Sequence, residues 1–441
     1  MNSNKPLSPT GSFPIETNPN HHALDESQDA GNSQEAVVNN NNSKTKKPQS
    51  TLIHIIYLSA AAIVGATLRV YLGRLLGGDC EDFMEAPQDF LTPLSKHICV
   101  TSNGRSLQTG GALFRDLPAN LLGSFVMGLV SSSSGIRIPW LPNNHILQQD
   151  DLFHLMISTG FCGSLTTFAS WNTQMVVMMD GTMTELGSQI VVALFGYLVG
   201  FMLPISAFSY GKQVAVLLHT WKEDRTNDSS NQNDHNHNDG TGTGGGEEVA
   251  SDEQHAKPSK CYCDNHHPWK FLFLVTGLVV LALFVVGFVS YDVAFYQSMI
   301  LIIPLAPLGA LTRWKLSRFN NSNHRKICNK SFDWFPFGTW TANVVGAVCS
   351  IACTAILDRR RKLVLEGKAA YDMDPWSNAV LFAVATGFGG SLSTVSSMVK
   401  EIVSLAEANP SVVRAHAYAI LTFASAMLIS LIIYSITLRM E

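Results

Sequence analysis

Charged residues are scarce in this chain of 441 residues. Asp, Glu, Lys and Arg together make up 15% of the sequence, whereas hydrophobic residues make up 46%. The polar residues gather in the first 50 positions and in roughly residues 212–268, which leaves the rest strongly apolar. Apolar runs of about 20 residues are long enough to cross a bilayer as helices. The composition therefore predicts a polytopic membrane protein in a lipid bilayer.

Several other signals are missing, and each absence excludes a class of function. The first 50 residues contain no apolar stretch near their start, so they are not expected to form a signal peptide. No basic stripe runs among aromatic residues, so nucleic-acid binding has no support. The histidines and cysteines between residues 235 and 267 match no closed tetrahedral metal pattern. No nucleophile is paired with a base in a catalytic pattern, so the chain is not expected to be an enzyme.

The domain organisation follows from the alternation of polar and apolar stretches. The Asn- and Ser-rich tail and the Asn-, His- and Gly-rich linker are too polar to bury a core, so both are predicted to be disordered. The predicted parts are an N-terminal tail over 1–50, a first four-helix unit over 51–210, the linker over 211–268, a lone transmembrane helix over 269–290 and a second four-helix unit over 291–441.

An unusual stretch lies inside the third apolar run of the first unit. Gly160 to Trp171 reads Gly-Phe-Cys-Gly-Ser-Leu-Thr-Thr-Phe-Ala-Ser-Trp, and a close copy occupies Gly387 to Met398. The glycines and hydroxyl-bearing residues favour a broken third helix in each unit. Such a break frees backbone carbonyls, so it persists in a membrane only inside protein or at an ion or solute site. The alternative is a seam of small residues that only packs helices together.

The first unit recurs in order in the second. Gly-Ala-Thr-Leu-Arg69 returns as Gly-Ala-Leu-Thr-Arg313, and Ala-Asn120 returns as Ala-Asn343 ahead of the second copy of the broken stretch. One extra helix between two four-helix units turns the second unit upside down. The predicted fold is therefore an all-α inverted repeat with nine transmembrane helices, whose shared site lies near the bilayer midplane.

Two kinds of polar side chain interrupt the apolar runs. An amide in hydrocarbon needs partners, so Asn120 and Asn343 are expected to point inward. Arg69 and Arg313 are expected near helix ends, where each can snorkel or face a water-filled vestibule.

Together these motifs resemble the Fluc, or CrcB, family of fluoride channels. The resemblance rests on Gly-x-x-x-Arg, Ala-Asn-Leu-Leu-Gly-Ser-Phe and Gly-Phe-Cys-Gly-x-Leu-Thr-Thr-Phe, and it covers both membrane units but neither the tail nor the linker. The doubled chain is similar to the eukaryotic, fused export-protein branch. The resemblance implies a fluoride-selective channel that exports fluoride passively across the plasma membrane and gives fluoride resistance. It also implies that a single chain acts as a fused pseudo-dimer with two pores.

The resemblance also implies which residues bind ions. A pore must replace the water around fluoride with amide hydrogens, hydroxyls and the positive edges of aromatic rings. The implied anion-binding residues are Asn120, Asn343, Phe168, Trp171, Thr167, Thr394, Tyr418 and Thr422, with Arg69 and Arg313 in the vestibules. A structural sodium ion is implied at the main-chain carbonyls of Gly163, Thr166, Gly390 and Ser393.

The second half departs from the family pattern. Val395 and Met398 stand where the first half has Phe168 and Trp171. Conversely, the last span carries Tyr418 and Thr422 one turn apart, and the fourth span of the first half has no comparable pair. We therefore predict one working pore and one vestigial pore.

A proton-coupled exporter with an inverted repeat is the alternative function. It would need a titratable carboxylate inside a span, whereas Asp180, Glu185, Asp292 and Glu401 all lie at predicted helix ends. A structural or receptor protein would use the two asparagines only to hold helices together, but it gives no reason for the repeated break.

Orientation is predicted from the basic residues. With nine spans, the lysines of the tail, the linker and the loop from Arg318 to Lys330 share one side, which the positive-inside rule places in the cytoplasm. The cluster Arg359 to Lys362 then lies outside, against the rule. Cys80 and Cys99 would share a loop on the oxidising side, where a disulfide could persist or the two thiols could remain free. The four sequons, which are expected to carry no glycan, lie at Asn41, Asn227, Asn320 and Asn329.

Overall fold

A computed structural model describes part of the chain. The described residues are 51–76, 100–102, 111–131, 151–185, 187–235, 293–320, 334–368, 375–408 and 412–440, and within them the side chains of 222–235 and 293–296 are not described. The predicted lone helix over 269–290, the N-terminal tail, and Cys80 and Cys99 lie outside these residues.

The first half contains four apolar helical segments in chain order, and the third is divided into pieces. They are α1 (Thr51–Leu76), α3 (Leu117–Val130), the series α5 (Asp151–Leu155), η2 (Met156–Cys162), α6 (Gly163–Leu165) and α7 (Ala169–Asp180), and α8 (Ile190–His235).

The second half repeats this order. Its elements are α10 (Val293–Leu316) with η3 (Ser317–Asn320), α11 (Phe337–Leu365), the series α12 (Pro375–Ala383), η6 (Val384–Gly389), α13 (Gly390–Leu392) and α14 (Ser396–Ala408), and α15 (Val413–Arg439).

Proline and glycine set several helix ends. Pro118 lies in the first turn of α3 and Pro375 starts α12, where the missing N–H costs no helical hydrogen bond. Gly181 follows α7 with φ +74°, a left-handed conformation that glycine adopts without strain and that ends the helix. These residues fix where the helices stop and turn back.

Seven helices in the described part of the chain are long and apolar enough to cross a membrane. Each divided third helix, taken from α5 to α7 or from α12 to α14, counts as one of them. The apolar α3 is shorter, with 14 residues. The prediction of an all-helical, multi-pass membrane protein is confirmed.

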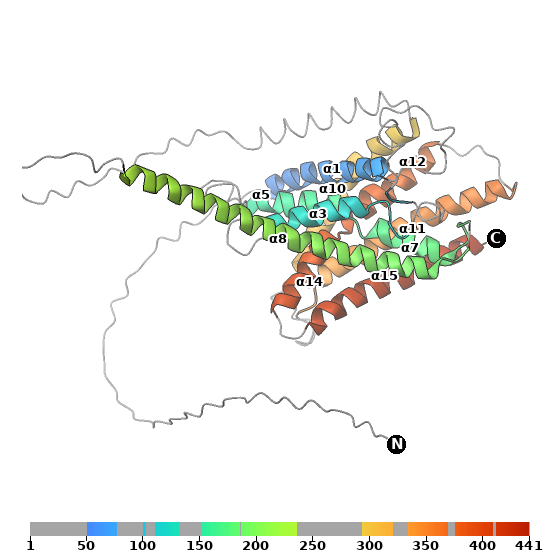
Figure 1. The fold of residues 1–441 in the computed structure, drawn as a ribbon. Helices are drawn as coiled ribbons and strands as arrows, with labels where there is room; N and C mark the ends of the chain where they lie inside the picture. Colours follow the sequence, from blue (N-terminus) through green and yellow to red (C-terminus); the bar gives the residue numbers. More distant parts are fainter. Residues whose placement is uncertain are drawn as a thin grey trace, which may run out of the picture. The chain divides into compact units, whose positions relative to one another are not determined.

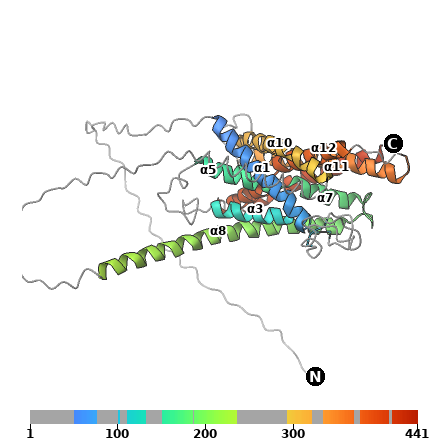
Figure 2. The same cartoon turned by 90° about the horizontal axis from the view of Figure 1, so that it is seen from above.

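Helix α8 extends further than the sequence indicated. The linker was predicted to begin at residue 211, but the helix continues without interruption to His235. In Figures 1 and 2 its C-terminal end projects beyond the bundle formed by the other labelled helices. Polar residues such as those after Trp221 favour loops only weakly when a stable helix precedes them, because adding one residue to an existing helix is far easier than starting a new one.

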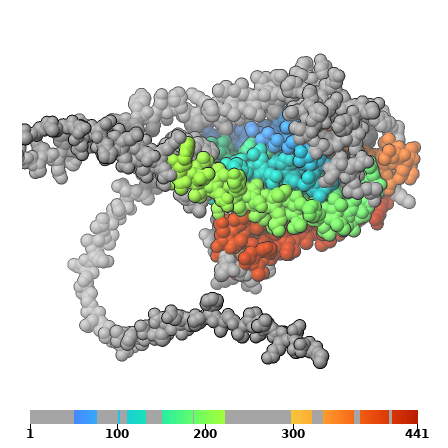
Figure 3. Space-filling view, in the orientation of Figure 1, coloured from blue at the N-terminus to red at the C-terminus, as the bar shows by residue number. Residues whose placement is uncertain are grey.

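The two halves interleave in the core. Helix α1 packs along α10, while α7 of the first half packs against α11 and α15 of the second. In return, α14 of the second half packs against α3 and α8 of the first. Figure 3 shows α3 and α8 side by side on one face, with the last helices beside them. Each divided third helix therefore lies between helices of the opposite half.

Candidate functional site

The two divided helices are interrupted at matching places. In the first half the π-helical η2 leads into α6, after which Thr166 has an extended backbone with φ −88° and ψ 145°. In the second half η6 leads into α13, after which Ser393 is extended with φ −77° and ψ 159°. Helical structure resumes at Ala169 and Ser396. Backbone groups at both interruptions need partners from elsewhere in the protein.

Arg69, on α1 of the first half, reaches both interrupted segments. Its Nη1 donates to the carbonyl oxygens of Ser164 and Gly390, each at 2.8 Å, and its Nη2 donates to the carbonyl of Thr386. One guanidinium nitrogen therefore joins a carbonyl of the first half to a carbonyl of the second.

Arg313, on α10 of the second half, makes the reciprocal contacts. Its Nη1 donates to the carbonyl oxygens of Gly163 at 2.6 Å and Ser393 at 3.2 Å, and its Nη2 donates to the carbonyl of Thr159. The two arginines thus bind the interrupted segments of both halves together.

Arg313 lies in the last turn of α10, near a helix end as the sequence suggested, but neither arginine is exposed there. Both are buried, Arg69 with 0% and Arg313 with 3% of its surface exposed, so they do not face a vestibule. The expectation was wrong because helix position alone did not reveal that the other half supplies carbonyl acceptors. Glycine is required beside them, since a Cβ on Gly163 or Gly390 would come within 2.2 or 2.5 Å of a guanidinium nitrogen.

Three of the four carbonyls predicted to bind sodium lie at this centre. The carbonyl oxygens of Gly163, Gly390 and Ser393 accept hydrogen bonds from the arginines. Thr166 has an extended backbone and directly follows α6, which begins at Gly163. Each carbonyl oxygen has two lone pairs, and an arginine uses one, so the oxygens fit a hard cation by donor chemistry.

Hydroxyl groups join the two interruptions to each other. The Thr166 hydroxyl lies 3.2 Å from that of Thr394 and 3.1 Å from that of Ser396. The Thr167 hydroxyl lies 3.3 Å from that of Ser393, which also accepts a hydrogen bond from a backbone N–H of the first half. The predicted pair Thr167 and Thr394 therefore belongs to a buried network that crosses between the halves.

The two asparagines are buried, as the sequence indicated, but their partners differ. Asn120 Nδ2 donates to the Thr167 carbonyl at 3.1 Å, and its Oδ1 accepts from the Thr167 N–H at 2.8 Å. Asn343 Oδ1 accepts from the Thr394 N–H at 2.7 Å, whereas its Nδ2 faces only the sulfur of Met398 at 3.7 Å. Sulfur is a weak acceptor, so the Asn343 amide retains more capacity to donate to a ligand.

Comparison with protein families identifies the repeat. The family of CrcB-like proteins (Camphor Resistance, CrcB) matches residues 56–207 and again residues 300–434, which together exceed half of the chain. The chain belongs to the CrcB family. It contains two CrcB domains, one in each half, and no solved structure matches it.

Curated relatives include bacterial channels and a fungal export protein. "Fluoride-specific ion channel FluC" of Enterobacter sp. (strain 638) is 33% identical over 81 residues, which are 18% of this chain and 57% of that protein. "Fluoride export protein 1" of Candida albicans is 38% identical over 100 residues, which are 23% of each chain. The aligned part thus covers less than two thirds of each relative. Neither is named as an enzyme, in agreement with the sequence analysis.

An aromatic cluster surrounds Phe168 and Trp171 of the first CrcB domain. The two rings meet edge to face with centroids 5.7 Å apart. Phe423 on α15 of the second domain lies 5.6 Å from Phe168 and 5.2 Å from Trp171. Tyr197 and Phe201 of α8 complete the cluster at 5.8 and 5.6 Å from Phe423. The sequence analysis missed Phe423, because only the interleaving of the domains brings it to this place.

The buried face of α15 is lined with hydroxyl groups. Tyr418, Thr422, Ser430 and Tyr434 are all buried and recur at multiples of four residues, so they lie along one side of the helix. At buried positions up to Trp221, where its side chains are described, the corresponding helix α8 of the first domain carries only apolar residues: Ala193, Gly196, Gly200, Pro204, Phe208, Gly211 and Ala215. The fourth helices of the two CrcB domains therefore differ in polarity.

Glu401 corrects another sequence expectation. It was placed at a helix end, but it lies inside α14 and inside the sixth candidate span. Its Oε2 accepts a hydrogen bond from the Tyr418 hydroxyl at 2.7 Å, and its Oε1 accepts from Thr339 and Asn320. The apolar run in the sequence is shorter than the helix, which is why the carboxylate was assigned to its end.

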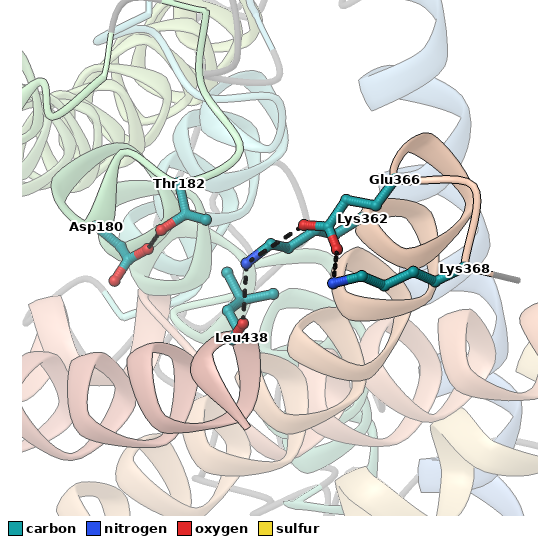
Figure 4. A network of polar contacts seen from close by, with 6 residues as sticks. All are labelled: Asp180, Thr182, Lys362, Glu366, Lys368 and Leu438. Carbon is teal, nitrogen blue, oxygen red and sulfur yellow. Dashed lines mark hydrogen bonds and ion pairs between the residues drawn. The ribbon is translucent and has the colours of Figure 1, made fainter. Parts of the chain in front are cut away.

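A second polar cluster lies at the far end of α15. Lys362 donates to the carbonyl of Leu438, and Glu366 pairs with Lys362 and Lys368, as Figure 4 shows. The hydrogen bond and positive charge of Lys368 lower the pKa of Glu366. Nearby on α11, the buried Asp358 accepts a hydrogen bond from the Tyr434 hydroxyl at 2.8 Å. The hydroxyl-lined face of α15 thus has a carboxylate bound to a tyrosine at each end.

Proposed function

We propose that this CrcB protein is a fluoride-selective channel that exports fluoride passively across the plasma membrane and so gives fluoride resistance. The membership in the CrcB family and the names of the FluC and export-protein relatives support this function. The observation that carries it is the aromatic cluster around Phe168 and Trp171, which lies beside the hydroxyl-lined face of α15.

The chemistry of this region suits a small anion. Fluoride holds its water tightly, so a selective path must offer hydrogen-bond donors and positive ring edges in its place. The edge-to-face contacts of Trp171 and Phe423 leave ring edges within the cluster. The hydroxyls of Tyr418 and Thr422 on α15 donate to Glu401 and to the Tyr418 carbonyl in this structure, and each would have to turn to donate to an anion. A low-dielectric surrounding strengthens each of these interactions with a charge.

Only one of the two pores is proposed to conduct. The route would run where α7, α11 and α15 pack together, with aromatics from the first domain and hydroxyls from the second. The related route beside α14, α3 and α8 has Val395 and Met398 in place of the aromatics and the apolar face of α8 in place of the hydroxyls. The second route lacks both kinds of group that stabilise an anion, so we propose that it is vestigial.

We propose further that sodium binds at the carbonyls of Gly163, Thr166, Gly390 and Ser393. The ion would supply positive charge that neutralises carbonyl dipoles at the junction of the domains. The arginines hold carbonyls of both domains in place there, as their hydrogen bonds at 2.6–3.2 Å support.

A proton-coupled exporter is the second candidate, and Glu401 now favours it. A carboxylate within a span can bind and release a proton, so that proton movement in one direction drives substrate movement in the other. Glu401 accepts a hydrogen bond from Tyr418, which lies on the proposed route. Coupling would require that transport responds to a proton gradient as well as to the fluoride gradient.

Fluoride efflux from liposomes that contain the purified protein tests both candidates. A channel should release fluoride without an imposed proton gradient, should exclude chloride, and should carry current. An exporter should stop when the proton gradient is collapsed, and Glu401→Gln should abolish its coupling. Absence of fluoride transport under either condition would contradict the proposed function.

A further inference from the structure

A polar contact of three helices lies next to the aromatic cluster. Asn172 on α7 donates from Nδ2 to the Ser430 hydroxyl oxygen on α15 at 2.9 Å. The Tyr197 hydroxyl on α8 donates to Asn172 Oδ1 at 2.8 Å. Asn172 and Ser430 have no exposed surface. Helices of both domains therefore meet at one buried amide.

These hydrogen bonds leave two donors unused. Asn172 Nδ2 carries two hydrogens, and one of them goes to Ser430. Ser430 accepts that bond, and its own hydroxyl hydrogen finds no acceptor among the described residues. Because Tyr197 occupies the acceptor side of Asn172, the amide is held with its NH₂ group toward α15. Buried donors without acceptors are costly unless a ligand uses them.

The position of this contact connects it to the proposed route. The ring of Tyr197 lies 5.7 Å from Trp171 and 5.8 Å from Phe423, so one side chain belongs to both the aromatic cluster and the polar contact. Along α15, Ser430 lies two turns beyond Thr422 and one turn before Tyr434 on the same buried face.

The described residues of the second domain make no equivalent contact. At the offset of 227 residues that relates the third helices, Val399 stands in place of Asn172. Helix packing alone would be served by a polar contact in either domain, whereas a ligand site is needed only where the anion passes. Asn172 occurs on α7, which also bears Trp171 and which Phe168 immediately precedes.

We propose that the Asn172 amide and the Ser430 hydroxyl form an anion-binding subsite of the conducting pore, in which Tyr197 is a positioning residue. The inference rests on the proposed function. Both donors turn toward fluoride after it leaves the aromatic cluster, and no carboxylate contacts either group among the described residues.

Fluoride efflux from liposomes tests the subsite with Asn172→Val and Ser430→Ala. Each change removes a hydrogen bond to a charged ligand, so each should lower the rate by about tenfold or more. The double variant should lose little more than either single one, because the two donors act on one ion. Tyr197→Phe should lower the rate less, since it frees the amide to turn without removing a donor.

Matched variants separate this role from helix packing. Thr173→Val changes the next buried residue of α7, and Ser425→Ala removes another hydroxyl of α15, and neither should alter efflux. Gel filtration and thermal unfolding show which variants are folded. Ser430→Thr keeps a hydroxyl, so it should retain most of the efflux rate.

Wild-type efflux from folded Asn172→Val or Ser430→Ala would overturn the subsite. If Asn172→Val does not fold, Ser430→Ala against Ser430→Thr decides alone. If wild-type protein itself moved no fluoride, the proposed function would fail instead.

Discussion

Replacing the two asparagines by serine should have unequal effects on conduction and on stability. Asn120 is bound at both ends of its amide to the backbone of Thr167. Asn343 has one strong hydrogen bond, to the N–H of Thr394, and its NH₂ group faces only a methionine sulfur. The first amide therefore closes a break, whereas the second has donors available for an anion.

The magnitudes follow from these partners. Asn120→Ser removes two hydrogen bonds of about 0.5–1.5 kcal/mol each, so it should lower the free energy of unfolding by about 1–3 kcal/mol. Asn343→Ser removes one such bond and a weak contact, so the loss of stability should be about half as large. A hydrogen bond to an ion is worth about 1.5–3 kcal/mol, so its removal should slow conduction about 10- to 150-fold.

The assay measures fluoride efflux from liposomes and thermal unfolding of the same preparations. We expect Asn343→Ser to reduce efflux strongly at nearly normal stability, and Asn120→Ser to reduce stability with a smaller effect on the rate. Equal partial losses of efflux in both variants would show two live pores and refute the asymmetry. The reverse ranking would assign the conducting route to the other side of the molecule.

Four further predictions follow from the same contacts. Phe168→Ile should collapse fluoride efflux, whereas Val395→Ile should leave it nearly unchanged, and equal effects in the same assay would contradict a single aromatic route. Replacing sodium by a large organic cation should lower the unfolding temperature if the carbonyl centre binds the ion, and an unchanged temperature would exclude it. Arg69→Lys keeps the charge but replaces two guanidinium nitrogens, which together reach three carbonyls, by one ammonium nitrogen, so calorimetry should show lower stability. Glycosylation mapping should find all four sequons bare, and Asn320 cannot carry a glycan while its Nδ2 bonds Thr339 and Glu401.

Sequence alone predicted much of the scaffold, because it depends on local patterns that repeat. The apolar runs marked the helices, and the copy of Gly160–Trp171 at Gly387–Met398 located both interruptions. The inward direction of both asparagines followed from the high cost of an amide in lipid. The end of α8 was misjudged because a helix can continue into polar sequence where no breaker occurs.

The parts that sequence missed all depend on contacts between the domains. Nothing in the pattern around Arg69 indicates that a carbonyl of residue 390 lies beside it. Phe423 and Ser430 look like ordinary residues of an apolar helix, and only the packing of α15 against α7 brings them to Trp171 and Asn172. A search for hydroxyls at four-residue spacing along the last span would have found Ser430, since Tyr418 and Thr422 already indicated that face.

The exchange of arginines also explains which features each domain must keep. Arg69 and Arg313 each bind the interrupted segments of both domains, so the loss of either arginine would leave buried carbonyls unpaired in both domains. Each asparagine binds the interruption of its own domain. The scaffold therefore requires both copies of these residues. The arginine contacts do not involve the side chains of Val395 and Met398, so these residues can replace aromatics without disturbing those contacts. This arrangement explains the symmetry of the scaffold, and it is compatible with the asymmetric pores that we propose.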